Sequence, residues 1–326
     1  MRIMAARTWG SLRLEKLKRD NGLDMDPECE LLISCGSQAS LYAIFTSLIE
    51  QGDEVIIPEP SYYPMYKAMI ELSGGVPKPV PMIREEGFRL DPEAVRKAVT
   101  RRTRMIVLNT PVNPTGSVFD LNELRRLAEV ALENALYVVA DEAYEKLVYD
   151  GSKHHSIASL PKMKNVALTV QTLSKTYSMT GFRVGYVAAG SDVIEQVGKV
   201  HYYMNIYASA ISQRAALAAL TGPQDYVAEI VKEYHARRRL LVEGLNEVEG
   251  FKCLAPKGTF YSFPDISSFG LSEEFAVRLL KATGIVAAYG SGFGPHGEGH
   301  LRMSFAKTRE DIEECIRRLK KDAPRL

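Results

Sequence analysis

Residues 171–186 read Gln171-Thr-Leu-Ser-Lys175-Thr-Tyr-Ser-Met-Thr-Gly-Phe-Arg183-Val-Gly-Tyr186. They lie between two apolar runs, 166–170 and 184–189, and each run predicts a buried strand. Lys175 is therefore expected in a connection at the edge of a sheet, where a ligand can reach it. Small and hydroxylated neighbours suit an anion, and Arg183 can bind a phosphate through two N–H groups. A lysine whose pKa is lowered by a nearby positive charge is a good amine nucleophile. The alternative is two solvated charges in a polar loop.

Apolar runs that predict strands alternate with amphipathic helices through the first two thirds of the chain. The predicted strands are 31–34, 54–57, 104–108, 135–140 and 166–170, and predicted helices open at Gly36 and at Leu121. Asp120 and Glu123 have the spacing of a capping box at the start of the second helix. Strands that are apolar along their whole length are typical of a mostly parallel sheet covered by helices on both faces. We therefore predict an α/β fold with an N-terminal segment (1–22), a large domain (23–223), and a long helix leading to a smaller C-terminal α/β domain (224–326).

Three polar motifs stand beside predicted strands, where open α/β sheets bind their ligands. Gly36-Ser37-Gln38 opens a helix whose first N–H groups can bind an anion, although an ordinary capped helix would look the same. Asn113 is fixed in a rigid turn by two X-Pro bonds. Asp141 ends a fully apolar strand, and a buried carboxylate is costly without a cation. Either a core Arg or Lys or a ligand could supply that positive charge.

Two further features concern aromatic and cationic side chains. The strand 54–57 is followed by three tyrosines, Tyr62, Tyr63 and Tyr66. An aromatic ring there can stack on a flat heterocycle, but packing is the interpretation we favour for Tyr62 and Tyr66. Arg302 alternates with apolar neighbours and so points to the opposite face of its predicted strand. From the residues alone it is either an edge-strand charge or a ligand contact.

These motifs occur in the same order as in the class I/II aminotransferases, which the chain resembles from about residue 12 onward. That family, which includes aspartate aminotransferase, consists of fold type I enzymes that use pyridoxal 5'-phosphate (PLP). The resemblance implies that Lys175 forms a Schiff base with PLP, and that Arg183 binds the phosphate. The other implied cofactor contacts are Gly36, Ser37, Gln38 and Thr172 at the phosphate, Tyr63 on the ring, Asn113 and Tyr144 at the phenolic oxygen, and Asp141 at the ring nitrogen. Arg302 would bind the α-carboxylate of the substrate, with Asn113 beside it.

The reaction implied by the resemblance is transfer of an amino group from an L-amino acid to a 2-oxo acid in ping-pong order. Lys175 would then be the general base at the substrate Cα. A PLP-dependent Cβ–S lyase on the same fold is the alternative. The resemblance also implies a homodimer. In most relatives an upstream segment covers the substrate and donates an aromatic residue to the neighbouring subunit. Residues 1–11 match that segment poorly, so a catalytically impaired chain is a further alternative.

Composition narrows the class of protein independently. With 326 residues and 46% hydrophobic content, the chain can bury a large core. A formal net charge of +1 gives no field that favours nucleic acid or an anionic membrane. No apolar run reaches the roughly 18 residues of a membrane span, and the four cysteines form no C-x-x-C pair, so we expect a cytoplasmic protein with reduced thiols. The histidine pairs lack the H-E-x-x-H order, so we expect no metal site.

Overall fold

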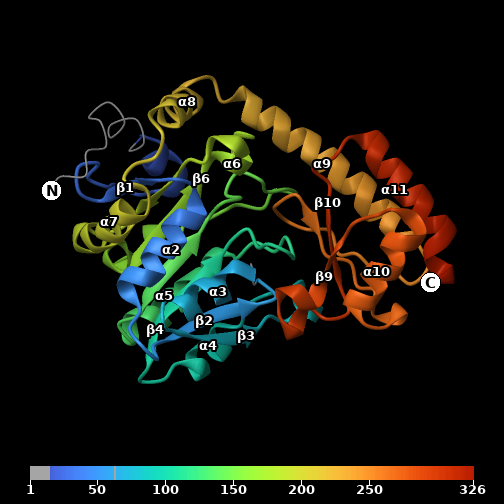
Figure 1. Ribbon diagram of the computed structural model, residues 1–326, viewed down its shortest axis with the longest axis horizontal. Helices are drawn as coiled ribbons and strands as arrows, with labels where there is room; N and C mark the ends of the chain where they lie inside the picture. Colours follow the sequence, from blue (N-terminus) through green and yellow to red (C-terminus); the bar gives the residue numbers. More distant parts are fainter. Residues whose placement is uncertain (1–14, 62–63) are drawn as a thin grey trace.

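A computed structural model of the chain describes residues 15–61 and 64–326. Figure 1 shows a large sheet flanked by helices and a smaller part at the C-terminal end, joined by one long helix. Each part has its own buried hydrophobic cluster, so each is organised around a core of its own. The predicted α/β fold with a smaller C-terminal α/β part is confirmed.

The large sheet contains seven strands in the order β1-β7-β6-β5-β4-β2-β3. Their bounds are β1 (Leu31–Ser34), β2 (Glu54–Glu59), β3 (Val76–Pro81), β4 (Thr103–Asn109), β5 (Tyr137–Asp141), β6 (Ala167–Thr172) and β7 (Gly185–Ala188). β7 runs antiparallel to both of its neighbours, and the other pairings are parallel. The sheet is therefore mostly parallel, and the carboxyl ends of β4, β5 and β6 meet at one edge.

Helices cover the two faces of this sheet because its strands are apolar on both sides. One face packs against α2 (Ser37–Leu48), α3 (Pro64–Leu72) and α7 (Ser191–Asn205), and the other against α4 (Pro92–Ala98), α5 (Leu121–Glu133) and α8 (Ala210–Thr221). Neighbouring residues of β5 divide between the faces: Val139 joins the first cluster, and Val138 and Ala140 join the second. Side chains of successive residues in a strand therefore face different sites, whereas those two residues apart can share one.

The smaller part is built on a three-stranded antiparallel sheet in the order β8-β10-β9. Its elements are β8 (Tyr261–Ser262), α10 (Ser272–Thr283), β9 (Ala288–Tyr289), β10 (Leu301–Ser304) and α11 (Arg309–Asp322). The long helix α9 (Asp225–Asn246) leads into it and packs against α11 (Figure 1). The domain boundaries at residues 22 and 223 stay a prediction.

Several local predictions are confirmed, and others need correction. The helix after Asp120 has the expected capping box, in which the Asp120 carboxylate accepts the Glu123 N–H at 2.8 Å and the Glu123 carboxylate accepts the Asp120 N–H at 2.8 Å. The strand predicted from residue 135 begins at Tyr137, because Ala135 has a φ of 51°. None of the described helices is long and apolar enough to cross a membrane.

Candidate active site

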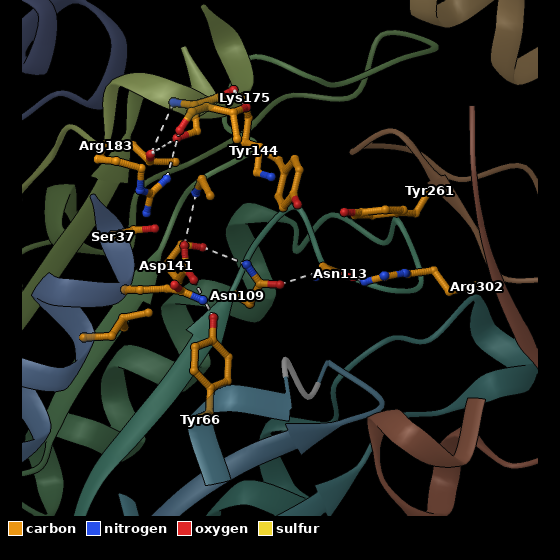
Figure 2. A pocket seen from close by; sticks show the side chains of 16 residues that line it. Ser37, Tyr66, Asn109, Asn113, Asp141, Tyr144, Lys175, Arg183, Tyr261 and Arg302 are labelled. Atoms are coloured by element: carbon orange, nitrogen blue, oxygen red, sulfur yellow. Dashed lines mark hydrogen bonds between the residues drawn. The ribbon is translucent and has the colours of Figure 1, made fainter. Parts of the chain in front are cut away.

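A cavity of about 310 Å³ opens at the carboxyl edge of the large sheet and reaches to the small domain. Figure 2 shows its side chains converging from both parts of the molecule. The cavity is lined by Ser37, Gln38, Leu41, Tyr66, Asn109, Asn113, Asp141, Ala143, Tyr144, Thr172, Ser174, Lys175, Thr180, Arg183, Tyr261 and Arg302. It therefore lies where ligands of open α/β sheets bind.

Lys175 enters the cavity from a single helical turn, α6 (Leu173–Thr176), that directly follows β6. Thr172 caps this turn, because its hydroxyl accepts the Ser174 N–H at 3.2 Å. The Lys175 Nζ lies 5.8 Å from the ring centroid of Tyr144 and 5.4 Å from that of Phe260. Two aromatic rings, one from each part of the molecule, therefore hold the amine at the cavity.

Asp141 is the last residue of β5 and is only 7% exposed. Its carboxylate accepts the Tyr66 hydroxyl proton at 2.5 Å and the Ala143 N–H at 3.2 Å. No lysine, arginine or histidine of the described residues forms a salt bridge with it. Burial raises the pKa of Asp141, and the two hydrogen bonds offset only part of that rise. A cation placed in the cavity would thus stabilise the Asp141 carboxylate.

Asn113 links the sheet edge to the small domain. The Asn109 side chain, at the end of β4, accepts the Asn113 N–H at 2.8 Å and donates to the Asp141 carbonyl at 3.0 Å. Arg302 on β10 donates to the Asn113 side-chain oxygen at 3.1 Å. The Arg302 guanidinium also lies 4.4 Å from the ring centroid of Tyr261. These contacts fix the arginine at the cavity, with further N–H groups able to bind a carboxylate.

The opposite end of the cavity is rich in N–H and O–H donors. Ser37 begins α2 and leaves the first N–H groups of that helix facing the cavity side. Gly36 has a φ of 95°, and a Cβ there would lie 2.8 Å from Arg183 Nη2. A glycine is therefore needed for the turn and for the close approach of Arg183. Arg183 itself donates to the Thr180 carbonyl at 3.0 Å, so this end is built for an anion.

Tyr144 stands between the two ends of the cavity. Burial, together with the neighbouring Tyr261 hydroxyl, raises the pKa of Tyr144 well above its usual value. Its hydroxyl therefore stays protonated and can donate a hydrogen bond to a ligand oxygen.

The structure brings most of the predicted residues together. Those that line the cavity are Ser37, Gln38, Asn113, Asp141, Tyr144, Thr172, Lys175, Arg183 and Arg302. Gly36 contacts Arg183 without lining the cavity, and Tyr63 lies outside the described residues. The packing interpretation of Tyr66 is confirmed, since its ring is buried in the core, but its hydroxyl also bonds Asp141, which was not predicted. The position of Tyr66 could have indicated this contact, since it lies in the first turn of α3, which follows the carboxyl end of β2.

Ser174, one of the hydroxylated neighbours of Lys175 expected to suit an anion, also lines the cavity. Cavity residues that the sequence did not single out are Asn109, Ala143, Thr180 and Tyr261. The position of Asn109 at the end of a strand could have indicated it. The approach of Tyr261 depends on how the two parts of the chain pack, and no local pattern reports that.

One cavity thus holds an amine, a buried acid that forms no salt bridge with any described residue, and two arginines at opposite ends. These features suit a small anionic molecule that reacts with a lysine. Comparison with known proteins identifies the class of protein. Residues 11–319 match the family model of the class I and II aminotransferases. The chain is 40% identical to an aspartate aminotransferase of Pyrococcus abyssi, with 94% of this chain and 79% of that protein covered.

Two further comparisons agree. The chain is 39% identical to an aromatic-amino-acid aminotransferase of Thermococcus litoralis, over 94% of this chain and 79% of that protein. The crystal structure of an aromatic aminotransferase from Pyrococcus horikoshii superposes with a TM-score of 0.95 at 37% identity, over 98% of this chain and 85% of that one. The chain belongs to the class I and II aminotransferases, and its reaction is amino-group transfer. The named relatives do not favour the lyase alternative.

Proposed function

We propose that the cavity binds PLP and an amino acid and moves the amino group to a 2-oxo acid in ping-pong order. The observation that supports this most is the placement of Lys175 and Asp141 at one cavity, where the buried acid has no salt-bridge partner among the described residues. When bound, PLP supplies an electron sink for the bond broken at the substrate Cα, provided that its ring nitrogen is protonated. Asp141 is the residue that would hold that proton on the ring nitrogen.

The donor set of the cavity fits the cofactor. A phosphate would bind where Arg183, Thr172 and the N-terminus of α2 present their donors, beside the space that Gly36 leaves open. Asn113 and Tyr144 would bind the phenolic oxygen. Lys175 would bind the cofactor covalently. Gln38, which lines the cavity, is a further proposed contact, and Tyr63 is proposed on the resemblance alone.

Two residues would act on the substrate. Arg302 would bind the α-carboxylate, because its guanidinium is held against Tyr261 and Asn113 with N–H groups to spare. Lys175 would take the proton from the substrate Cα and return it, since it is the cavity's only lysine among the described residues. Because the related enzymes are named for aspartate and for aromatic amino acids, these are the first donors to test.

We also propose a homodimer and a cytoplasmic location. Support for the dimer comes from an exposed apolar surface between α7 and α8, formed by Tyr203, Ile206, Tyr207 and Ile211. The Cys35 thiol contacts the Tyr207 carbonyl at 3.9 Å, so this surface adjoins the turn that carries Ser37. Support for the reducing compartment comes from the four free cysteines. Sedimentation of the purified protein tests the dimer.

Absorbance titration with PLP, followed by an amino-donor screen with 2-oxoglutarate, tests the proposed function. We expect the protein to acquire visible absorbance, and one or more donors to change it and release a 2-oxo acid. Protein that stays colourless in excess PLP would contradict the proposal. Release of pyruvate and ammonia without an added oxo acid would instead indicate the lyase.

A further inference from the structure

A second group of polar side chains is buried behind the cavity, on the other face of the sheet edge. It joins the turn η1 (Leu17–Asn21) and the residue before it to the segments after β5 and at the end of β6. Its members are Lys16, Asn21, Glu142, Glu145, His154 and Gln171, and we call them the rear cluster. Glu142 is fully buried and Lys16 is 3% exposed, so bulk solvent does not screen these charges.

The two carboxylates of the rear cluster are held side by side by two amides. Asn21 Nδ2 donates to Glu142 Oε2 at 3.0 Å and to Glu145 Oε2 at 2.8 Å. Gln171 Nε2 donates to the same two oxygens at 3.1 and 2.9 Å. Two buried carboxylates that share the same amide donors lie close enough to repel each other, so the arrangement requires positive charge nearby.

Lys16 supplies positive charge beside Glu145, and the His154 imidazole Nε2 lies 3.2 Å from Glu142 Oε2. The Lys16 Nζ lies 2.5 Å from Glu145 Oε1 and donates to Asn21 Oδ1 at 2.8 Å. Burial acts to lower the pKa of Lys16, but Glu145 outweighs it and the pKa is raised, so the ammonium persists. Burial likewise acts to raise the pKa of Glu145, and Lys16 reverses this, so the carboxylate stays ionised. The ligand atoms of Glu142, Glu145 and His154 lie within 4.8 Å of one another, but an ammonium already beside Glu145 disfavours a metal ion there.

The rear cluster is tied by sequence to the cavity. Glu142 follows Asp141, Glu145 follows Tyr144, and Gln171 precedes Thr172. Successive side chains of an extended strand point to opposite faces, so Gln171 faces the rear cluster while Thr172 faces the cavity. A shift of the rear cluster therefore moves the backbone that carries the cavity residues, because one peptide unit joins each pair.

We propose that Lys16 is a positioning residue for the cofactor site, an inference that rests on the function proposed above. Its ammonium pairs with Glu145 and Asn21, and the Asn21 and Gln171 amides join Glu145 to Glu142. These side chains hold the ends of β5 and β6 in the register that places Asp141, Tyr144 and Thr172 around the cavity. The turn before Gly22 is thus the rear wall of the cofactor site. Without Lys16 the two carboxylates separate or bind a proton, and the cavity residues move apart.

The dissociation constant of PLP, measured by absorbance titration of folded apoprotein, tests this inference. Lys16→Met should weaken PLP binding about tenfold or more, as expected for coupled neighbouring residues. The double variant Lys16→Met/Glu145→Gln removes both partners and should return to within about threefold of the unaltered protein, because matched removal of an ion pair is often neutral. Lys78→Met is the control, since Lys78 pairs with Glu54 at the far side of the sheet and should leave binding unchanged.

Two further readouts separate positioning from loss of fold. Circular dichroism and urea unfolding of each apoprotein show whether it folds. If Lys16→Met does not fold, Asn21→Leu removes one bridging amide without changing charge, and should weaken PLP binding severalfold. The pH midpoint of the bound cofactor's absorbance should move in Lys16→Met and return in the double variant, which lower stability alone would not produce.

Two results would overturn this inference alone, and a third would overturn the proposed function as well. Equal PLP affinity in the unaltered protein and in folded Lys16→Met (or folded Asn21→Leu, if the former does not fold) removes the inference and leaves the proposed function standing. Equally weak binding in Lys16→Met and the double variant shows that charge balance is not what is transmitted. If the unaltered protein itself binds no PLP, the proposed function fails, and this inference with it.

Discussion

Asp141 and Glu142 are consecutive buried acids, yet their surroundings differ completely. Glu142 faces the rear cluster, where two amides donate to its carboxylate and the His154 imidazole lies 3.2 Å from it. Asp141 faces the cavity, where it has two hydrogen bonds and no salt bridge among the described residues. A buried charge whose partner comes from the chain is part of the fold, whereas one without such a partner indicates a ligand that brings the opposite charge.

Among changes to the cavity, Lys175→Ala is expected to have the largest effect. Removing the amine removes both the covalent cofactor contact and the general base, so turnover should fall on the order of 10⁴-fold or more. The visible absorbance of PLP-treated protein should lose its protein-bound form. Lys199→Ala, at an exposed pair with Glu195, is the matched control and should behave like the unaltered protein. An unchanged spectrum in Lys175→Ala would remove the assignment of the nucleophile.

Asp141→Asn tests the unpaired acid itself. We expect turnover to fall about 10³-fold, because an oriented charge at the reacting group is lost. The apoprotein should become more stable at neutral pH, by roughly 1–3 °C in Tm. Burial raises the pKa of Asp141, so the folded state keeps a proton that the unfolded chain releases, and stability falls as pH rises between the two pKa values. The stability advantage of Asn should disappear in acid, below both values; a constant difference would contradict this.

Arg302→Gln separates substrate binding from cofactor binding. Loss of a charge-assisted pair with the α-carboxylate should lower kcat/KM about 10²-fold, corresponding to roughly 2–3 kcal/mol. PLP affinity should stay within about twofold, because Arg302 lies at the end of the cavity away from Arg183. Steady-state kinetics with amino and oxo acids checks the first expectation, and absorbance titration the second. A large loss of PLP affinity would show that Arg302 binds the cofactor and would contradict its assignment to the substrate.

Tyr66→Phe removes one hydrogen bond from Asp141 and leaves the ring. The carboxylate then loses a donor that favours its charged form, so PLP binding should weaken about tenfold. Tyr149→Phe is a close control, because Tyr149 is equally buried and its hydroxyl donates at 2.5 Å to the Thr259 carbonyl. If both variants bind PLP alike, the Tyr66 hydroxyl does not act on Asp141.

Glu145→Gln tests the rear cluster through protein stability. Its effect on stability at neutral pH should be opposite in sign to that of Asp141→Asn. The Lys16 ammonium, acting against burial, keeps the pKa of Glu145 below its usual value. That carboxylate therefore contributes stability above its unfolded pKa and loses it as pH falls through the folded pKa. We expect the variant to be about 1–3 kcal/mol less stable at neutral pH, measured by urea unfolding, with a smaller difference in acid. A Glu145→Gln protein that is more stable than the unaltered protein would show that the buried charge of Glu145 is no better compensated than that of Asp141.

Much of the fold follows from local patterns in the chain. Apolar runs predicted β1, β2, β4, β5, β6 and β7, and the Asp120 to Glu123 spacing predicted the start of α5. Less periodic elements were not predicted, among them β3 and the helices α3, α7 and α8. β3 carries Pro77, Pro79 and Pro81, which sit at an edge strand where their missing N–H groups cost little.

The site divides in the same way. Lys175, Asp141 and Asn113 were predictable because each lies at or shortly after the end of a strand, in a sequence context with its own chemistry. Tyr261 and Asn21 were not, because Tyr261 meets Tyr144, and Asn21 meets Glu142, across more than 100 residues of chain. Only the packing of the whole molecule brings them together. Arg238 in α9 is a similar case, because it is buried and bonds Asp150 where α9 packs on the segment after β5.

The ring nitrogen of bound PLP provides the most direct test of whether Asp141 receives its cation from the cofactor. Protein loaded with ¹⁵N-labelled PLP should give the NMR chemical shift of a protonated ring nitrogen, at a pH where the free cofactor has lost that proton. The same label in Asp141→Asn should report an unprotonated nitrogen. An unprotonated nitrogen in the unaltered protein would contradict the pairing of Asp141 with the cofactor.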